Sequence, residues 1–290
     1  MDLYFMGQVL TELVSLLQLE KIEDGIYRGQ SQDLGFKALF GGQVMGQAVS
    51  AAQETVAEDR VIHSLHSYFL RAGDANKPVV YEVENLRDGR SFNTRRIKAI
   101  QNGKPIFYMT ASFQVTEKGF EHQDLMPSVP GPDDVKSYND FIFDHQEYIP
   151  ESIRGKFLAE KPIEVRPVQE YNWVHPEKSD PLCQMWIKAN GSLFDDPRTH
   201  FCMLAYCSDF QFLTTSLMPH AASHWHPNFQ IASVDHAMWF HRPFKIDEWL
   251  LYSTDSPSAC GGRGLVKGQI YNQKGELVAS TMQEGVIRQR

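Results

Sequence analysis

The stretch FGGQVMGQAVSAAQ, residues 40–53, decides the fold of this 290-residue chain. Its residues are small or apolar on every side, which predicts a helix that is buried all round. Glycine inside a helix costs about 0.5–1 kcal/mol relative to alanine, so Gly41, Gly42 and Gly46 indicate compensation by close packing or by an approaching ligand. The sequence therefore predicts a central helix that other layers surround.

Strands follow this helix. Residues 63–70, 79–84, 91–101 and 105–114 are rich in β-branched and aromatic residues, and Asn102-Gly103 predicts a tight hairpin between the last two segments. A helix at residues 9–19 and a short strand at residues 26–29 are expected before the central helix. The first half is thus predicted to be a buried helix beside an antiparallel meander.

The second half repeats this order. A strand is expected at residues 183–189, a mostly apolar helix at 199–213, and strands at 230–240, 249–253, 264–272 and 277–287. Phe69-Leu70-Arg71 aligns with Phe240-His241-Arg242, and Gln101-Asn102-Gly103 aligns with Gln273-Lys274-Gly275, at nearly the same spacing. A duplicated unit explains this agreement, and a chance likeness of two meanders is the alternative.

The expected fold class is α+β, with two tandem repeats in which an antiparallel sheet wraps around a central helix. We expect an N-terminal extension at residues 1–8, a first repeat at 9–118, a linker rich in proline and turn formers at 119–165, and a second repeat at 166–290. Each sheet alone would leave an unpaired edge, so pairing of the two edges into one continuous sheet is expected.

Composition excludes several classes of protein. A formal net charge of −8, from 28 basic and 36 acidic residues, disfavours a nucleic-acid binder. No uncharged apolar run reaches the ~20 residues of a bilayer span. Four cysteines are too few for a disulfide framework and indicate a reducing compartment. The C-terminal residues Ile287-Arg-Gln-Arg290 are no peroxisomal address, so a cytoplasmic location is expected.

Asp209 is the most informative polar residue, because it interrupts the apolar segment LAYCSDFQFL at residues 204–213. If it is buried, desolvation raises its pKa toward the range of a general base; if it ends the helix, it simply meets solvent. Ser233 and Gln283 each lie in an apolar strand, where such a residue is more often a hydrogen-bonded part of the sheet. Asp235 and His236 follow Ser233 closely, but no spacing rule makes these residues a catalytic triad.

The chain lacks GxSxG, HExxH and Walker A motifs. A metal site at His220, His224 and His226 is open, but no cysteine or acidic residue has ligand spacing there. His63 and His66 fall on opposite faces of their expected strand and make poor joint ligands. No metal is therefore expected.

Five segments together are similar to one known family. They are FGGQVMGQ (40–47), HSLHSYFLR (63–71), IQNGKPIFYMTASFQ (100–114), DHAMWFHRPF (235–244) and QEG (283–285). The chain resembles bacterial acyl-CoA thioesterase II from about residue 9 to its end. The resemblance implies a double hotdog fold and hydrolysis of acyl-CoA to free acid and coenzyme A, without a metal or bound cofactor.

The resemblance also implies a catalytic set of Asp209, Ser233 and Gln283, with serine where the best-known members have threonine. Asp209 is expected to take a proton from water that Ser233 and Gln283 orient. By the repeat spacing, Ile62 and Ala111 occupy the corresponding positions of Ser233 and Gln283 in the first half, so one catalytic set per chain is expected.

Substrate contacts are expected at five further residues. His63 matches a histidine once suspected of catalysis in the family, Gly41 and Gly42 begin a helix that could bind an oxyanion, and Arg90 and Arg263 could meet the phosphates of coenzyme A. Association into a homo-oligomer, a dimer or tetramer, is usual for hotdog proteins. A hotdog hydratase or dehydratase and a non-catalytic acyl-CoA-binding module are the alternatives.

Overall fold

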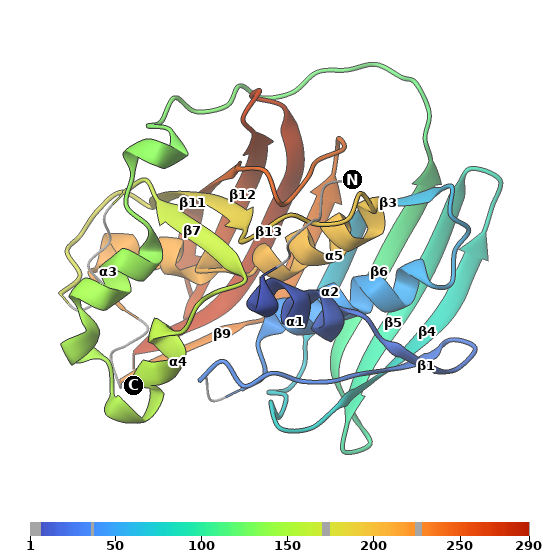
Figure 1. The fold of residues 1–290 in the computed structure, drawn as a ribbon, viewed down its shortest axis with the longest axis horizontal. Coiled ribbons are helices and arrows are strands. Elements are labelled where there is room, and N and C mark those ends of the chain that lie inside the picture. The colour runs from blue at the N-terminus through green and yellow to red at the C-terminus, as the bar shows by residue number, and fades with distance from the viewer. Residues whose placement is uncertain (1–6, 36–37, 170–174, 224–227, 290) are drawn as a thin grey trace.

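Two buried helices, α2 (Gly41–Gln53) and α5 (Pro197–Cys207), lie side by side at the centre of the molecule (Figure 1). A Cβ atom on Gly42 would lie 2.3 Å from the carbonyl oxygen of Tyr206, and one on Gly46 would lie 2.9 Å from that of Cys202. The two helix backbones therefore touch and run antiparallel. The predicted buried helix is confirmed, and close packing is the reason for its glycines.

This computed structural model describes residues 7–35, 38–169, 175–223 and 228–289. The first repeat contributes five neighbouring strands in the order β2 (Ile26–Gly29), β4 (Val79–Asp88), β5 (Phe92–Gln101), β6 (Lys104–Val115) and β3 (Arg60–Phe69). The strand β1 (Glu20–Glu23) pairs with β2, and the helix α1 (Gln8–Leu17) precedes it. Asn102 and Gly103 have φ values of 50° and 70°, as the predicted β5–β6 hairpin requires.

The second repeat has the same order. Its strands are β8 (Leu182–Ala189), β11 (Leu250–Cys260), β12 (Arg263–Asn272), β13 (Leu277–Gln289) and β10 (Asp235–Phe240). The strand β7 (Ile163–Pro167) pairs with β8, and β9 (Phe229–Ser233) pairs with β13. The double hotdog expectation is confirmed by this repeated sheet around two central helices.

The two repeats join where β3 pairs antiparallel with β10, with His66 opposite Ala237. The result is one sheet of 13 strands within the described residues. Ser67 Oγ also donates to the carbonyl of His236 at 2.8 Å across this junction. The expected pairing of the two sheet edges is thus confirmed.

Three predicted elements in the second half were wrong in extent. The strand expected at residues 249–253 continues to Cys260. The helix expected at residues 199–213 ends at Cys207, and a short 3-10 helix at Phe212–Ser216 follows Gln211, whose φ is 51°. The strand expected at residues 230–240 is two strands. Its backbone switches partners at Val234, whose N–H bonds to Glu284 of β13 and whose carbonyl accepts from Phe69 of β3.

Residues 116–162 contain no strand. They run over one end of the molecule and then form two short helices, α3 (Tyr138–Asp144) and α4 (Glu151–Leu158) (Figure 1). The helix α3 packs against β7, while Lys156 of α4 pairs with Asp33 of the first repeat at 2.6 Å. Trp186 Nε1 holds the segment by donating to the carbonyl of Pro130 at 2.9 Å. Among the described residues, no helix is both long and apolar enough to cross a bilayer.

Candidate active site

Asp209 lies two residues beyond the end of α5, not inside the helix as expected. Its carboxylate accepts hydrogen bonds from the backbone N–H of Gly42 and from the side chain of Gln283. A Cβ atom on Gly41 would come within 2.7 Å of Asp209 Oδ2, so the backbone of α2 packs directly on this carboxylate. The start of α2, the end of α5 and the strand β13 therefore meet at Asp209.

The N-terminus of α2 receives Asp209 because it has no side-chain cap of its own. Phe40 occupies the N-cap position and makes no capping hydrogen bond. Unpaired N–H groups and the helix dipole at that end favour a negative charge. Asp209, two residues beyond the end of α5, supplies this negative charge.

Burial raises the pKa of Asp209 from its ordinary value of 3.8 to about 7, despite the two hydrogen bonds that lower it. Part of the side chain remains accessible. A carboxylate with a pKa near neutrality is suited to accepting a proton in one step and returning it in the next. The sequence left open whether Asp209 is buried or meets solvent, and the structure places it half-buried where α2, α5 and β13 meet.

Gln283 connects Asp209 to Ser233. Its Nε2 donates to Ser233 Oγ at 2.5 Å and its side chain also donates to Asp209, while Gln283 itself is only 1% exposed. The oxygens of Ser233 and Asp209 therefore both lie within hydrogen-bonding reach of one amide nitrogen.

His236 is a further member of the site, and the sequence could not assign it a role. It is fully buried, with Nδ1 2.6 Å from Gln283 Oε1 and Nε2 3.1 Å from Ser208 Oγ. Burial lowers the pKa of His236 to about 4. Its position directly after Asp235 in an apolar strand was the available signal, but the partners come from β13 and from the end of α5.

The first repeat has no equivalent set. Thr55 lies two residues past the end of α2, as Asp209 does past α5, and its hydroxyl accepts from Arg95 at 2.8 Å. Ile62 and Ala111, aligned with Ser233 and Gln283, are buried apolar residues. These residues cannot activate water.

His63 and Arg90 lie far from Asp209. The ring of Phe69 adjoins Gly41, and His63 is six residues earlier on β3, or about 20 Å away. His63 instead bonds to Ser112 Oγ at 2.8 Å and contacts the ring of Phe92, and burial lowers its pKa. Arg90, in the turn before β5, lies at the same end of the sheet.

Arg263 lies at the catalytic end. Because β3 and β10 are antiparallel, corresponding hairpins of the two repeats point in opposite directions, so Arg90 and Arg263 cannot form one patch. Arg263 pairs in register with Val286, close to Gln283, and its Nε donates to Glu284 at 2.9 Å. It is the better placed of the two expected phosphate contacts.

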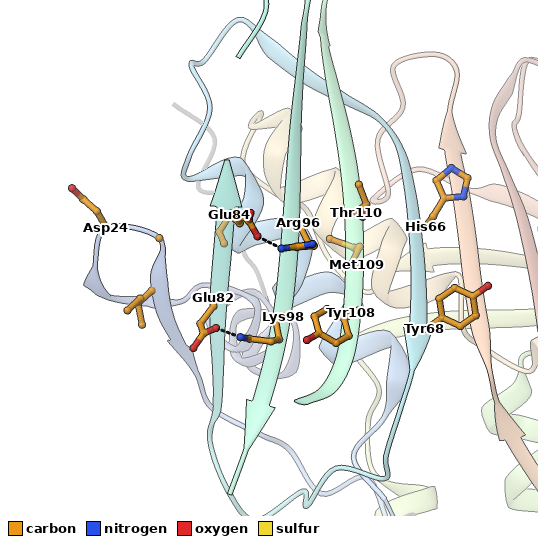
Figure 2. A pocket seen from close by; sticks show the side chains of 13 residues that line it. Asp24, His66, Tyr68, Glu82, Glu84, Arg96, Lys98, Tyr108, Met109 and Thr110 are labelled. Carbon is orange, nitrogen blue, oxygen red and sulfur yellow. Dashed lines mark hydrogen bonds and ion pairs between the residues drawn. The ribbon is translucent and has the colours of Figure 1, made fainter. Parts of the chain in front are cut away.

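A cavity of about 690 Å³ lies on the outer face of the first repeat and does not include the expected catalytic residues. Figure 2 shows two ion pairs in its lining, Glu84 with Arg96 and Glu82 with Lys98. These cations already have carboxylate partners, so the cavity lacks free charge for an anionic ligand.

No three His, Cys, Asp or Glu side chains are grouped for metal binding within the part of the chain that the structure describes. His224 and His226 lie outside the described residues.

Comparison with known proteins fits this geometry. A family model described as acyl-CoA thioesterase matches residues 152–286, and one described as acyl-CoA thioesterase N-terminal domain matches residues 30–114. Acyl-CoA thioesterase 2 of Haemophilus influenzae is 47% identical over 98% of this chain and 99% of its own length. Human acyl-coenzyme A thioesterase 8 is 41% identical, covering 97% of this chain and 91% of its own length.

Solved structures agree in fold. Acyl-CoA thioesterase II from Mycobacterium marinum has a TM-score of 0.79 and 42% identity over 96% of this chain and 98% of its own. A hotdog protein from Alicyclobacillus acidocaldarius has a TM-score of 0.76 at 19% identity, covering 96% of this chain and 98% of its own.

The repeated sheet and the half-buried carboxylate together define a double hotdog protein with a polar site around Asp209. The full-length identity narrows the class further, and the chain belongs to the acyl-CoA thioesterase family. The resemblance found in the sequence is thereby confirmed.

Proposed function

We propose that this protein hydrolyses acyl-CoA thioesters to a carboxylic acid and coenzyme A, using a water molecule held between Asp209 and Ser233. One observation carries the residue assignment: the Gln283 amide bridges a serine hydroxyl and a carboxylate whose pKa burial raises to about 7. Full-length identity to acyl-CoA thioesterases supports the substrate class.

In the first step, the water oxygen attacks the thioester carbonyl carbon while Asp209 takes one water proton. Gln283 occupies the Ser233 lone pair, so the Ser233 hydroxyl hydrogen is free to hold the water. The tetrahedral intermediate then expels the coenzyme A thiolate, which takes the proton back from Asp209. No covalent acyl-enzyme forms, and the sum is one water consumed per thioester broken.

We propose a role for the Gly42 N–H in holding Asp209, and the oxyanion role expected of Gly41 and Gly42 stays a prediction. The Gly42 N–H donates to Asp209 and thereby fixes the base. Arg263 is proposed to approach the phosphates of coenzyme A at this end of the sheet, exchanging part of its pairing with Glu284.

Free thiol release from acyl-CoAs of several chain lengths tests the reaction. Asp209→Asn is expected to lower kcat by at least about 1,000-fold, because the amide cannot accept the water proton. Asp255→Asn is the matched control, since Asp255 pairs only with Lys267 at the surface, and its kcat should equal that of the unchanged protein.

Three outcomes would contradict the proposal. Conversion between enoyl-CoA and hydroxyacyl-CoA without thiol release would indicate a hydratase or dehydratase. Ligand binding with no turnover would indicate a binding module. Near-normal kcat in folded Asp209→Asn would remove Asp209 from the role of base.

A cytoplasmic location and a homo-oligomeric state, dimer or tetramer, are also part of the proposal. Four free cysteines in the described residues support a reducing compartment. The outer sheet face exposes Tyr68 and Tyr108, aromatic residues of the kind enriched in interfaces. Light scattering of the purified protein measures its mass in solution.

A further inference from the structure

We infer that His236 is a positioning residue that fixes the orientation of the Gln283 amide, and thereby presents the amide nitrogen to Asp209 and Ser233. This inference rests on the proposed function, because the oriented amide matters for the water that Asp209 activates.

The first step is the orientation of Gln283. A carboxylate only accepts hydrogen bonds. The end of the Gln283 amide that faces Asp209 must therefore be its NH₂ group, not its oxygen. That NH₂ group also donates to Ser233 Oγ. Both of its hydrogens are then used, and Gln283 Oε1 faces away from the reacting water.

The second step is the protonation of His236. Gln283 Oε1 lies 2.6 Å from His236 Nδ1, and a carboxamide oxygen cannot donate, so Nδ1 carries the hydrogen. Burial keeps the ring neutral by lowering its pKa to about 4. His236 Nε2 is therefore an acceptor, and the Ser208 hydroxyl hydrogen is shared between this nitrogen, 3.1 Å away, and the Ala205 carbonyl, 2.9 Å away.

If the Gln283 amide turned over, its oxygen would face the Asp209 carboxylate and its NH₂ group would face the Nδ1–H of His236. Both contacts would be repulsive. The neutral Nδ1–H form of His236 thus excludes the turned amide, although His236 touches neither Asp209 nor the expected water.

The protein also fixes His236 itself. Ser67 Oγ, from the first repeat, donates to its carbonyl at 2.8 Å, and the ring of Phe212 lies 5.6 Å away, centre to centre. Other ionisable groups around the site are Tyr252, whose pKa burial raises well above 10, and Asp235, which accepts from the Glu284 N–H at 2.7 Å. Neither contacts the His236 ring.

The test compares two substitutions at His236. An asparagine Nδ2 falls near the place of the imidazole Nδ1 and keeps a donor toward Gln283, whereas leucine fills the space without one. His236→Leu is expected to lower kcat by about 10- to 100-fold with KM within about twofold, comparable to losing a group that orients a metal ligand. His236→Asn is expected to recover most of that loss.

The pH profile separates positioning from packing. The Gln283 amide lowers the pKa of Asp209. If the amide no longer faces Asp209 in His236→Leu, the apparent pKa on the acid side of the kcat profile (the acid limb) should rise by about one pH unit. His236→Asn should restore the limb. His241→Leu is the matched control, because it also removes an imidazole bonded to a β13 side chain, here Ser280 Oγ at 2.9 Å, but away from the site. Both kcat and its pH dependence should stay unchanged.

A spectroscopic measurement does not depend on activity or on the variants folding. Nitrogen-15 NMR of histidine-labelled protein is expected to show His236 as the neutral Nδ1–H form from pH 5 to 8. An Nε2–H form or a charged ring would overturn the inference, as would His236→Leu with unchanged kcat, or His236→Asn and His236→Leu equally impaired with an unshifted limb. Absence of thiol release by the unaltered protein would instead contradict the proposed function, and the NMR result would still decide the form of His236.

Discussion

At the scale of single residues, Asp209 opposes folding stability to catalysis, because the ionised form that accepts a proton is the form that burial destabilises. The ordinary pKa of 3.8 is raised to about 7, so the folded protein holds this proton more tightly than the unfolded chain does. By linkage, stability falls as pH rises from about 4 to about 7 and is then constant, and the full difference corresponds to about 4 kcal/mol.

Removing the charge should therefore stabilise the fold. Asp209→Asn is expected to increase the free energy of unfolding at pH 8 by about 1–3 kcal/mol, part of the full difference being lost to imperfect amide hydrogen bonds. The gain should be smaller near pH 5, and it should be lost only below about pH 4, where the unfolded chain also holds this proton. Thermal unfolding at the two pH values checks this, and an equal gain at both would contradict it.

The same proton controls the rate. Asp209 must be ionised to accept a proton, so kcat is expected to rise through an apparent pKa near 7 and to level off above about pH 8. A kcat profile measured from pH 5 to 9 checks this. Full activity at pH 5 would show that another group is the base.

Sequence reasoning grouped Asp209, Ser233 and Gln283 through the family resemblance, and the structure brings the three side chains together. Their catalytic role stays a prediction. Sequence reasoning could not find the contact between Asp209 and Gly42, which joins the end of one repeat's helix to the start of the other's. Nor could it assign His236, since hydrogen-bond partners from β13 and α5 meet only in the folded chain.

At the scale of elements, the antiparallel contact of α2 with α5 depends on missing side chains. Gly42→Ala would place a methyl group 2.3 Å from the Tyr206 carbonyl, which is backbone and cannot yield easily. We expect about 1–3 kcal/mol lower stability from overpacking, and lower kcat because the Gly42 N–H moves from Asp209.

Gly155→Ala in α4 is the matched control. No atom lies within 4 Å of an added Cβ there, so the better helix propensity of alanine should raise stability by about 0.5–1 kcal/mol without changing kcat. Urea unfolding and kinetics of both variants check the pair. Equal effects would show that α2 and α5 tolerate separation.

Element types were predicted well and their ends less well. Buried helices and alternating strands leave strong patterns, but the apolar segment continues past Cys207 and concealed the end of α5. There the chain turns at Gln211, in a left-handed conformation that apolar content does not reveal. The boundaries of the two repeats and their linker remain predictions.

At the scale of the whole molecule, the repeats share one sheet, one helix pair and one site. Cleavage in the strandless segment near Gly119, beside the fully exposed Phe120, should leave the two parts associated through β3–β10 and active. The second half produced alone should be inactive, because it lacks Gly41 and Gly42. Kinetics of cleaved and separate forms check this; an active second half alone would contradict it.

The uncapped start of α2 has one more consequence. The N-terminus of α5 is closed by its own Asp196, which accepts from the Arg198 N–H at 3.1 Å, so it has no comparable vacancy to offer another carboxylate. The second half of the chain thus contributes the carboxylate of Asp209, and the first half contributes the helix N-terminus that binds it. A symmetric pair made from two copies of either half would lack either the Asp209 carboxylate or the uncapped helix start that binds it. Each half therefore depends on the other, and neither can replace the other in the site.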